Sequence, residues 1–254
     1  MISLPLMKQT VKANWIIWLA MTAVSAVLLA QFAAVEVTRS LLFVIFYSIM
    51  ITIFPAIYSM ISANKLLASQ VDSGSMAYVL STPKSRAKVV STQVVYSVVS
   101  VVLMFVVTTV VHCAVNAAMP LEIAVATGGE VMESGDITSK MILECNISAC
   151  AASLAIAGLC YMFSGIFNRS KYSIGCSGVL VGTCILAGIM AMFGSLGVEA
   201  MGNFKYATLF SLYDYKSILL GVNDWIPKAV VAGVIALIGY VVGSGWFCKK
   251  DLPL

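Results

Sequence analysis

The residues best suited to covalent chemistry are a serine and a histidine that lie far apart in the chain. Ser177 stands in a G-x-S-G tetrapeptide, the form used by intramembrane serine proteases, and His112 is the single histidine. A nucleophile and its base must approach to about 3 Å. On spanning helices, Ser177 lies 6 residues after Lys171 and His112 lies 24 residues after Lys88. At about 1.5 Å rise per residue their depths differ by roughly 25 Å, so we expect no catalytic pair.

Other chemistry-bearing motifs are missing from the sequence. The seven cysteines lie almost entirely in apolar runs, without a C-x-x-C pair or a spacing that suits a metal. No G-x-x-x-x-G-K-[ST] loop, H-E-x-x-H pair or EF-hand pattern occurs. We therefore expect no enzyme activity and no cofactor in this chain. Its cysteines are predicted to be small buried apolar residues. They are Cys113, Cys145, Cys150, Cys160, Cys176, Cys184 and Cys248.

The composition indicates that the segments carrying these residues lie in a lipid bilayer. Of 254 residues, 61% are hydrophobic and 10% charged, whereas soluble domains carry about 25% charged residues. Six stretches of 20 residues or more contain no Asp, Glu, Lys or Arg. Each can cross about 30 Å of hydrocarbon as a helix, and period-2 alternation is absent. The sequence predicts an all-α integral membrane protein, a six-transmembrane-helix bundle, in one domain over residues 1–254. The predicted spans are 14–34, 41–63, 89–115, 145–167, 173–194 and 229–248.

The ends of the spans give the orientation. The first apolar run, 13–35, is longer than the roughly 7–15 residues of a signal-peptide core, so we read it as a retained span. With both termini cytoplasmic, the inside segments hold ten Lys or Arg against Asp72 and Asp251. The outside segments then hold five basic and nine acidic residues. This asymmetry predicts a multi-pass protein of the cell membrane with both termini in the cytoplasm.

The connections between spans differ in character. Residues 117–141 form an acidic outside loop, and residues 199–228 are rich in aromatics, which suits short helices at the outer interface. The inside loop 65–88 is mixed apolar and basic. It reads as two short helical pieces split at Ser73-Gly74, with Pro83 ending the second and Ser85 capping the next helix. On composition alone, this loop suits either docking of a soluble partner or contact with lipid headgroups.

Charged residues are missing from the predicted spans, and this absence bears on which classes of transporter the sequence fits. A proton- or sodium-coupled carrier is expected to hold acidic residues near the midplane, so a secondary transporter is disfavoured. The basic residues are scattered along the inner membrane edge, which does not favour nucleic-acid binding. Small residues at four-residue spacing, such as Gly239 and Gly243, predict close helix packing.

The stretch from Asp72 to Arg86 resembles the permease subunits of ABC-2 type transporters. In that family a Gly and a short helix precede Leu-Leu-Ser-x-Pro-x-x-Arg. Gly74, Leu80, Ser81, Pro83 and Arg86 match this form, and a valine replaces the first Leu. The aromatic segment 204–214 is also similar to the stretch before the last span of these permeases.

The resemblance implies a permease that pairs with itself or a sister permease and binds an ATP-binding cassette subunit, which holds ATP and Mg. The loop between spans 2 and 3 would be the cytoplasmic coupling helix. Its docking residues are then Lys65, Asp72, Gly74, Leu80, Pro83 and Arg86. The expected function is export of an amphipathic peptide or another apolar substrate, of the phenol-soluble-modulin or antimicrobial-peptide type. The alternatives are a membrane assembly or immunity factor without transport, or a sodium- or drug-type efflux permease.

Overall fold

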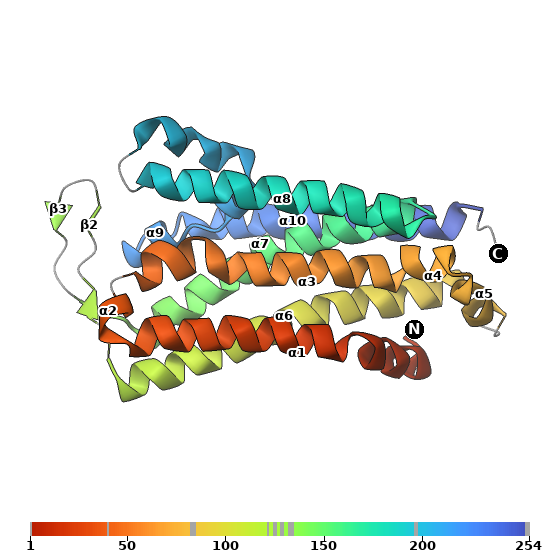
Figure 1. Cartoon of the computed structure of the whole chain (residues 1–254), viewed down its shortest axis with the longest axis horizontal. Coiled ribbons are helices and arrows are strands. Elements are labelled where there is room, and N and C mark those ends of the chain that lie inside the picture. The colour runs from red at the N-terminus through yellow and green to blue at the C-terminus, as the bar shows by residue number, and fades with distance from the viewer. Residues whose placement is uncertain are drawn as a thin grey trace.

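The computed structural model is a bundle of long helices (Figure 1). It describes residues 2–39, 41–81, 85–120, 122–123, 126–127, 130–131, 135–195 and 198–251. Within these ranges, six helical runs are long and apolar enough to cross a membrane, the same number as the predicted spans. They are Leu4–Ala34, Leu42–Asp72, Arg86–Ala118, Ser139–Ile166, Ser170–Gly194 and Trp225–Lys249.

The elements follow one another as an almost continuous series of helices. The long ones are α1 (Leu4–Ala34), α3 (Ile51–Leu66), α6 (Arg86–Ala118), α7 (Ser139–Ile166), α8 (Ser170–Ser195) and α10 (Trp225–Lys249). The short ones are α2 (Glu36–Arg39), the π-helix η1 (Leu42–Met50), α4 (Ala68–Asp72), α5 (Ser75–Leu80), the 3-10 helices η2 (Glu199–Ala207) and η3 (Leu209–Leu212), and α9 (Tyr215–Leu219). The membrane-length run Leu42–Asp72 consists of η1, α3 and α4. The predicted second span, 41–63, covers η1 and most of α3.

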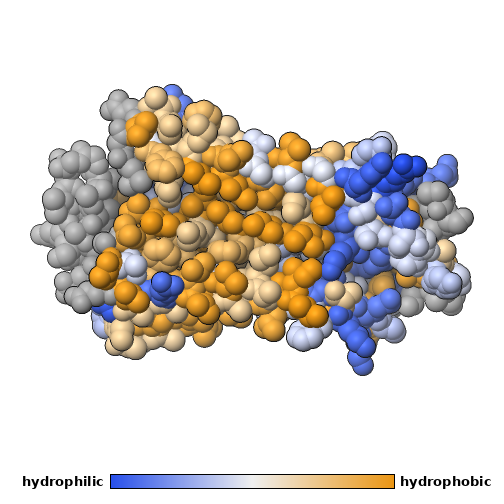
Figure 2. Space-filling model, viewed as in Figure 1, coloured by the Kyte–Doolittle hydropathy of each residue, from blue (hydrophilic) through white to orange (hydrophobic). Residues whose placement is uncertain are grey.

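The long helices direct polar residues inward and apolar residues outward. On α1, Asn14 and Ser25 are each 2% exposed, whereas Ile16 and Val27 are each 65% exposed. Water would favour the opposite arrangement, because it rewards burial of the apolar face. On the face shown in Figure 2, apolar side chains cover the middle and hydrophilic ones gather towards one end. This distribution is that of a multi-pass membrane protein.

Inward-facing polar groups join neighbouring helices. The indole Nε1 of Trp18 on α1 donates to the carbonyl of Ser100 on α6 at 2.9 Å. The Thr10 hydroxyl lies 3.2 Å from Oε1 of Gln93 on the same pair of helices. A polar group in an apolar interior costs free energy unless it is hydrogen-bonded. These contacts therefore fix the position of α1 against α6.

The closest backbone approach lies between α7 and α10. A Cβ added to Gly158 would stand 2.6 Å from the carbonyl oxygen of Ala236, and one on Gly243 would stand 2.8 Å from the Cα of Met162. A Cβ on Gly239 would meet the backbone of Gly158 at 2.5 Å. Only glycine allows these approaches. The close packing predicted from Gly239 and Gly243 is therefore confirmed, whereas an added Cβ on Gly178 or Gly182 of α8, which have the same spacing, would meet no backbone atom within 4 Å.

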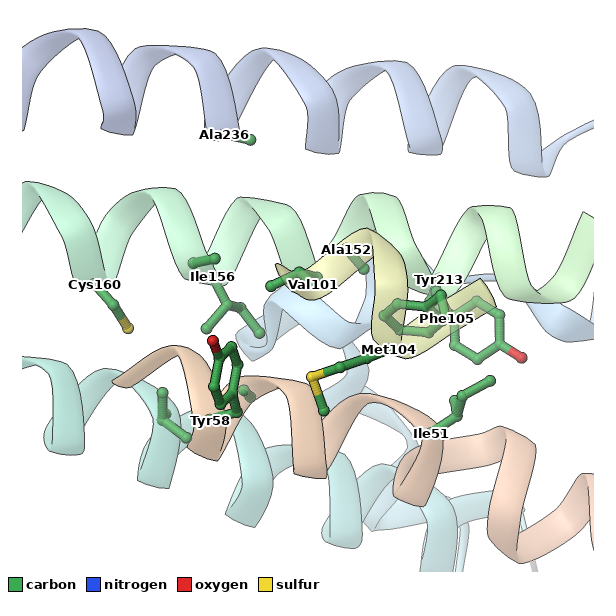
Figure 3. Packing of buried hydrophobic residues seen from close by; sticks show 14 of the residues in the cluster. Ile51, Tyr58, Val101, Met104, Phe105, Ala152, Ile156, Cys160, Tyr213 and Ala236 are labelled. Atoms are coloured by element: carbon green, nitrogen blue, oxygen red, sulfur yellow. The ribbon is translucent and has the colours of Figure 1, made fainter. Parts of the chain in front are cut away.

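The buried apolar core runs between these helices (Figure 3). Tyr58 on α3, Met104 on α6 and Ile156 on α7 are almost completely buried and point into the same space. Cys160 is also part of this core, and Cys145 and Cys184 are buried too. All seven cysteines are free thiols, three of them buried and four partly buried.

Two kinds of connection lie at the end of the bundle away from the termini. Between α6 and α7, β1 (Glu122–Ile123) pairs antiparallel with β4 (Gly135–Asp136), and β2 (Ala126–Thr127) with β3 (Glu130–Val131). The short helices predicted between α8 and α10 are present as η2, η3 and α9. Thr208 fastens them to α8 by a hydrogen bond to the carbonyl of Cys184 at 3.1 Å. Both chain termini lie at the opposite end, beside α4 and α5 (Figure 1).

The contact of α10 with α7 predicts different outcomes for two glycines on the same helix. Gly243→Ala places a methyl group against the α7 backbone, whereas Gly245 has nothing within 4 Å of an added Cβ. Overpacking costs about 1–3 kcal/mol, while Ala in a helix gains about 1 kcal/mol over Gly. We expect Gly243→Ala to lower the thermal unfolding midpoint in detergent and Gly245→Ala to leave it equal or raise it. Equal behaviour of the two variants would contradict the described packing.

Candidate docking surface beside the termini

The loop that follows α3 folds back as a compact unit at the end of the bundle that carries the termini. α4 ends at Asp72 and α5 begins at Ser75, as the sequence predicted for a split at Ser73-Gly74. Gly74 has φ of +72°, a left-handed conformation that costs other residues roughly 1–2 kcal/mol. An added Cβ there would meet nothing within 4 Å. Glycine is therefore needed at this corner for its backbone conformation alone.

The apolar side of the loop is buried against the bundle. Leu67, Val71 and Met76 are each at most 2% exposed, and Leu80 is partly buried against the same core. The backbone N–H of Ala68 donates to the Ser164 hydroxyl of α7 at 3.0 Å. The loop is thus attached to α7 as well as being continuous with α3.

Asp72 is engaged within the chain. Its Oδ2 accepts a hydrogen bond from the backbone N–H of Ser170, the first residue of α8, at 3.1 Å. The Ser170 hydroxyl in turn accepts from the amide of Asn64 on α3 at 2.8 Å. A carboxylate at a helix N-terminus satisfies a free N–H group and interacts favourably with the helix dipole. Asp72 and Lys65 form no ion pair with each other, although the structure describes both.

Arg86 is also engaged within the chain. Its Nη1 donates to the carbonyl of Lys250 at 2.9 Å, and the Lys250 ammonium donates to the carbonyl of Phe167 at 3.2 Å. These two bonds tie together the start of α6, the end of α7 and the end of α10. Ser85 accepts from the backbone N–H of Lys88 at 3.3 Å, which confirms the predicted cap.

The loop exposes one large apolar side chain among its described residues, Tyr78, which the sequence interpretation missed. It is 82% exposed in the middle of α5, while Met76 on the same short helix is fully buried. Met76 and Leu80 are four residues apart and share one face of α5, so Tyr78 has to point away from the bundle. A helical projection of residues 75–80 would have revealed this.

The six predicted docking residues have different roles in the structure. Gly74 shapes the loop, Leu80 packs on the core, and Asp72 and Arg86 hold other helices. Lys65 is partly exposed. Pro83, together with Thr82 and Lys84, lies outside the described residues. Tyr78 and the exposed serines beside it form a surface here called the α5 surface: Ser73, Ser75, Tyr78 and Ser81. Asp72, although bonded to Ser170, is exposed next to it.

Ser177 and His112 lie too far apart in the structure to form a catalytic pair. His112 hydrogen-bonds Tyr47, which also contacts Asn146 of α7, whereas Ser177 lies beside Cys160 of α7. The two α7 neighbours are 14 residues apart, or about 21 Å along the helix. Within the described residues, no three His, Cys, Asp or Glu side chains gather in a way that could hold a metal ion.

Comparison with known proteins assigns this chain to no family. No protein-family model matches the chain, and no curated protein matches it.

The position of Lys250 predicts a pH dependence of stability. Partial burial lowers the pKa of the Lys250 ammonium from 10.5 to about 8. Between pH 8 and 10.5 the folded state then binds fewer protons than the unfolded state, so stability rises with pH in this window. Because the Lys250 ammonium is partly accessible to solvent, we expect the free energy of unfolding to rise by only about 1 kcal/mol over this window. This corresponds to a rise of about 2–4 °C in the unfolding midpoint.

Two variants test this assignment. Lys250→Met should abolish the rise, and Lys249→Met, which makes the same charge change one residue away, should keep it. Unfolding midpoints in detergent at several pH values measure the difference. A rise that persists in Lys250→Met would show that another group is responsible.

Proposed function

We propose that this chain is the membrane-spanning permease subunit of an ATP-driven exporter of the ABC-2 type. The observation that supports this most is the α5 surface. It offers an almost fully exposed tyrosine on a short helix that is fastened to three long helices. Exposed aromatic side chains of this kind are enriched among the residues that dominate protein–protein binding.

The attachments of the loop give it a mechanical role in this proposal. A force on α5 passes to α3 through the chain, to α7 through Ser164 and to α8 through Asp72. A partner that closes on ATP would therefore move several helices at once, because interfaces and packed elements shift as rigid units. ATP and Mg would be bound by the partner, and this chain would contribute the docking surface and the path through the membrane.

The assignment of sides and cargo follows from the same proposal. The end with both termini and the α5 surface faces the cytoplasm, as the distribution of Lys and Arg predicts. The permease pairs with a second copy of itself or with a sister permease. Its cargo is an amphipathic peptide or another apolar molecule, which suits a chain whose predicted spans contain no charged residue.

A pair of exposed tyrosines provides a matched test. Tyr78 is 82% exposed on α5, and Tyr206 is 78% exposed on η2 beyond α8. Loss of a binding hot spot costs about 2 kcal/mol or more, roughly a thirtyfold change in affinity. We expect Tyr78→Ala to remove most of a co-purifying P-loop ATPase from native membranes, with the unfolding midpoint unchanged. Tyr206→Ala should retain the ATPase.

Asp72→Asn and Arg86→Gln complete this test. Because both side chains bond other helices, we expect these variants to lower the unfolding midpoint. They separate damage to the fold from loss of docking. Recovery of the wild-type chain without any nucleotide-binding subunit, identified by mass spectrometry, would contradict the proposed function and favour an assembly or immunity factor or a carrier that works alone.

A further inference from the structure

The segment before α3 has an unusual helical form. η1 is a π-helix of nine residues, Leu42–Met50, whereas π-helices are rare and mostly span a single turn. The backbone N–H of Ile51 bonds to the carbonyl of Phe46, five residues back. The segment runs without interruption into α3. A long π-segment at the start of a spanning helix requires a specific cause.

Residues just after η1 weaken ordinary α-helical pairing. Pro55 lies inside α3 and is buried. It has no N–H to offer the carbonyl of Ile51, and its ring crowds that carbonyl. The Thr52 hydroxyl donates to the carbonyl of Ile49 at 2.9 Å, so this carbonyl has a partner other than a backbone N–H. Both features make the α form less favourable in the turns that join η1 to α3.

A chain of buried hydrogen bonds holds the π form in place. The Tyr47 hydroxyl lies 2.5 Å from Nδ1 of His112 on α6. The amide of Asn146 on α7 donates to the same hydroxyl at 3.2 Å, and the Thr108 hydroxyl lies 3.2 Å from Oδ1 of Asn146. Phe43 stacks on Tyr47 with ring centroids 4.9 Å apart. These contacts join η1 to α6 and α7.

The direction of these bonds follows from the groups involved. The amide nitrogen of Asn146 can only donate, so the Tyr47 oxygen accepts from it. The single phenolic proton of Tyr47 is then free to go to His112 Nδ1. This arrangement gives the phenolic proton an acceptor and leaves the imidazole proton on Nε2, which is buried without a hydrogen-bond partner among the described residues. It depends on the angular position of Tyr47, which the π form sets.

We propose that η1 is a conformational switch. In one state the Tyr47–His112–Asn146 contacts hold the π form; in the other, η1 adopts α-helical pairing and Tyr47 turns away from His112. A π-helical turn contains more residues than an α-helical turn. Conversion of η1 from the π form to the α form therefore rotates the residues before η1 relative to α3. The far end of the same helix carries α4 and α5, so a displacement there is relayed along α3 to η1.

The inference goes beyond the proposed function, because it concerns the two states of η1 whatever binds the α5 surface. The single histidine makes a direct test available. Full-length protein labelled with nitrogen-15 in the histidine ring gives one imidazole, whose two nitrogen signals report which nitrogen carries the proton. We expect an Nε2-protonated ring with Nδ1 accepting a hydrogen bond. Tyr47→Phe should shift the Nδ1 signal, because it removes the donor.

The switch itself is tested by variants that do not touch His112. Pro55→Ala restores a backbone N–H to α3, and Thr52→Val releases the carbonyl of Ile49 with little change in shape. We expect both to move the His112 signals towards the positions seen in Tyr47→Phe. Pro227→Ala is the control, because Pro227 lies in the first turn of α10, where its missing N–H has no helical partner.

Folding of each variant is checked by its elution volume and unfolding midpoint, and Thr52→Val serves if Pro55→Ala does not fold. His112 signals that stay at the wild-type position in both Pro55→Ala and Thr52→Val, while Tyr47→Phe moves them, would overturn the switch and leave η1 as fixed packing. Signals unaffected by Tyr47→Phe would overturn the hydrogen bond on which it depends.

Discussion

The fold depends on contacts that can hold helices together even though their outer surface is apolar. Burial of apolar side chains gives little driving force between helices when the surroundings are apolar as well. Close backbone approach and buried hydrogen bonds have to supply the difference. The glycines between α7 and α10 supply the first. The inward-facing polar groups of α1 and α6 supply the second.

Hydrogen bonds between segments distant in the chain also hold the end of the bundle that carries the termini. Asp72 and Ser164 fasten the α4–α5 loop to α8 and α7, and Arg86 fastens α6 to the chain end beyond α10. The loop is therefore attached to the bundle and also exposes Tyr78. In the proposed permease, this combination lets a soluble partner act on several helices through one small surface.

The sequence predicted the long helices because each needs only an uninterrupted apolar stretch, and it predicted the break at Gly74 and the cap at Ser85 from local preferences of single residues. It did not predict the π form of η1, because that form depends on Tyr47 meeting His112 and Asn146, which are distant in the chain. The intrachain roles of Asp72 and Arg86 were missed for the same reason. Their partners lie on neighbouring helices, which the sequence does not place. The docking roles of Lys65, Asp72, Gly74, Leu80, Pro83 and Arg86 stay predictions.

The central claim is that the α5 surface is a docking site for an ATPase. Site-specific photo-crosslinking from position 78 in native membranes tests it most directly, with position 206 as the reference, because both tyrosines are highly exposed. If the α5 surface binds an ATPase, position 78 should form an adduct with a protein that carries a P-loop, and position 206 should form no such adduct. Adducts only with lipid from position 78 would contradict it and would assign this loop to the membrane surface.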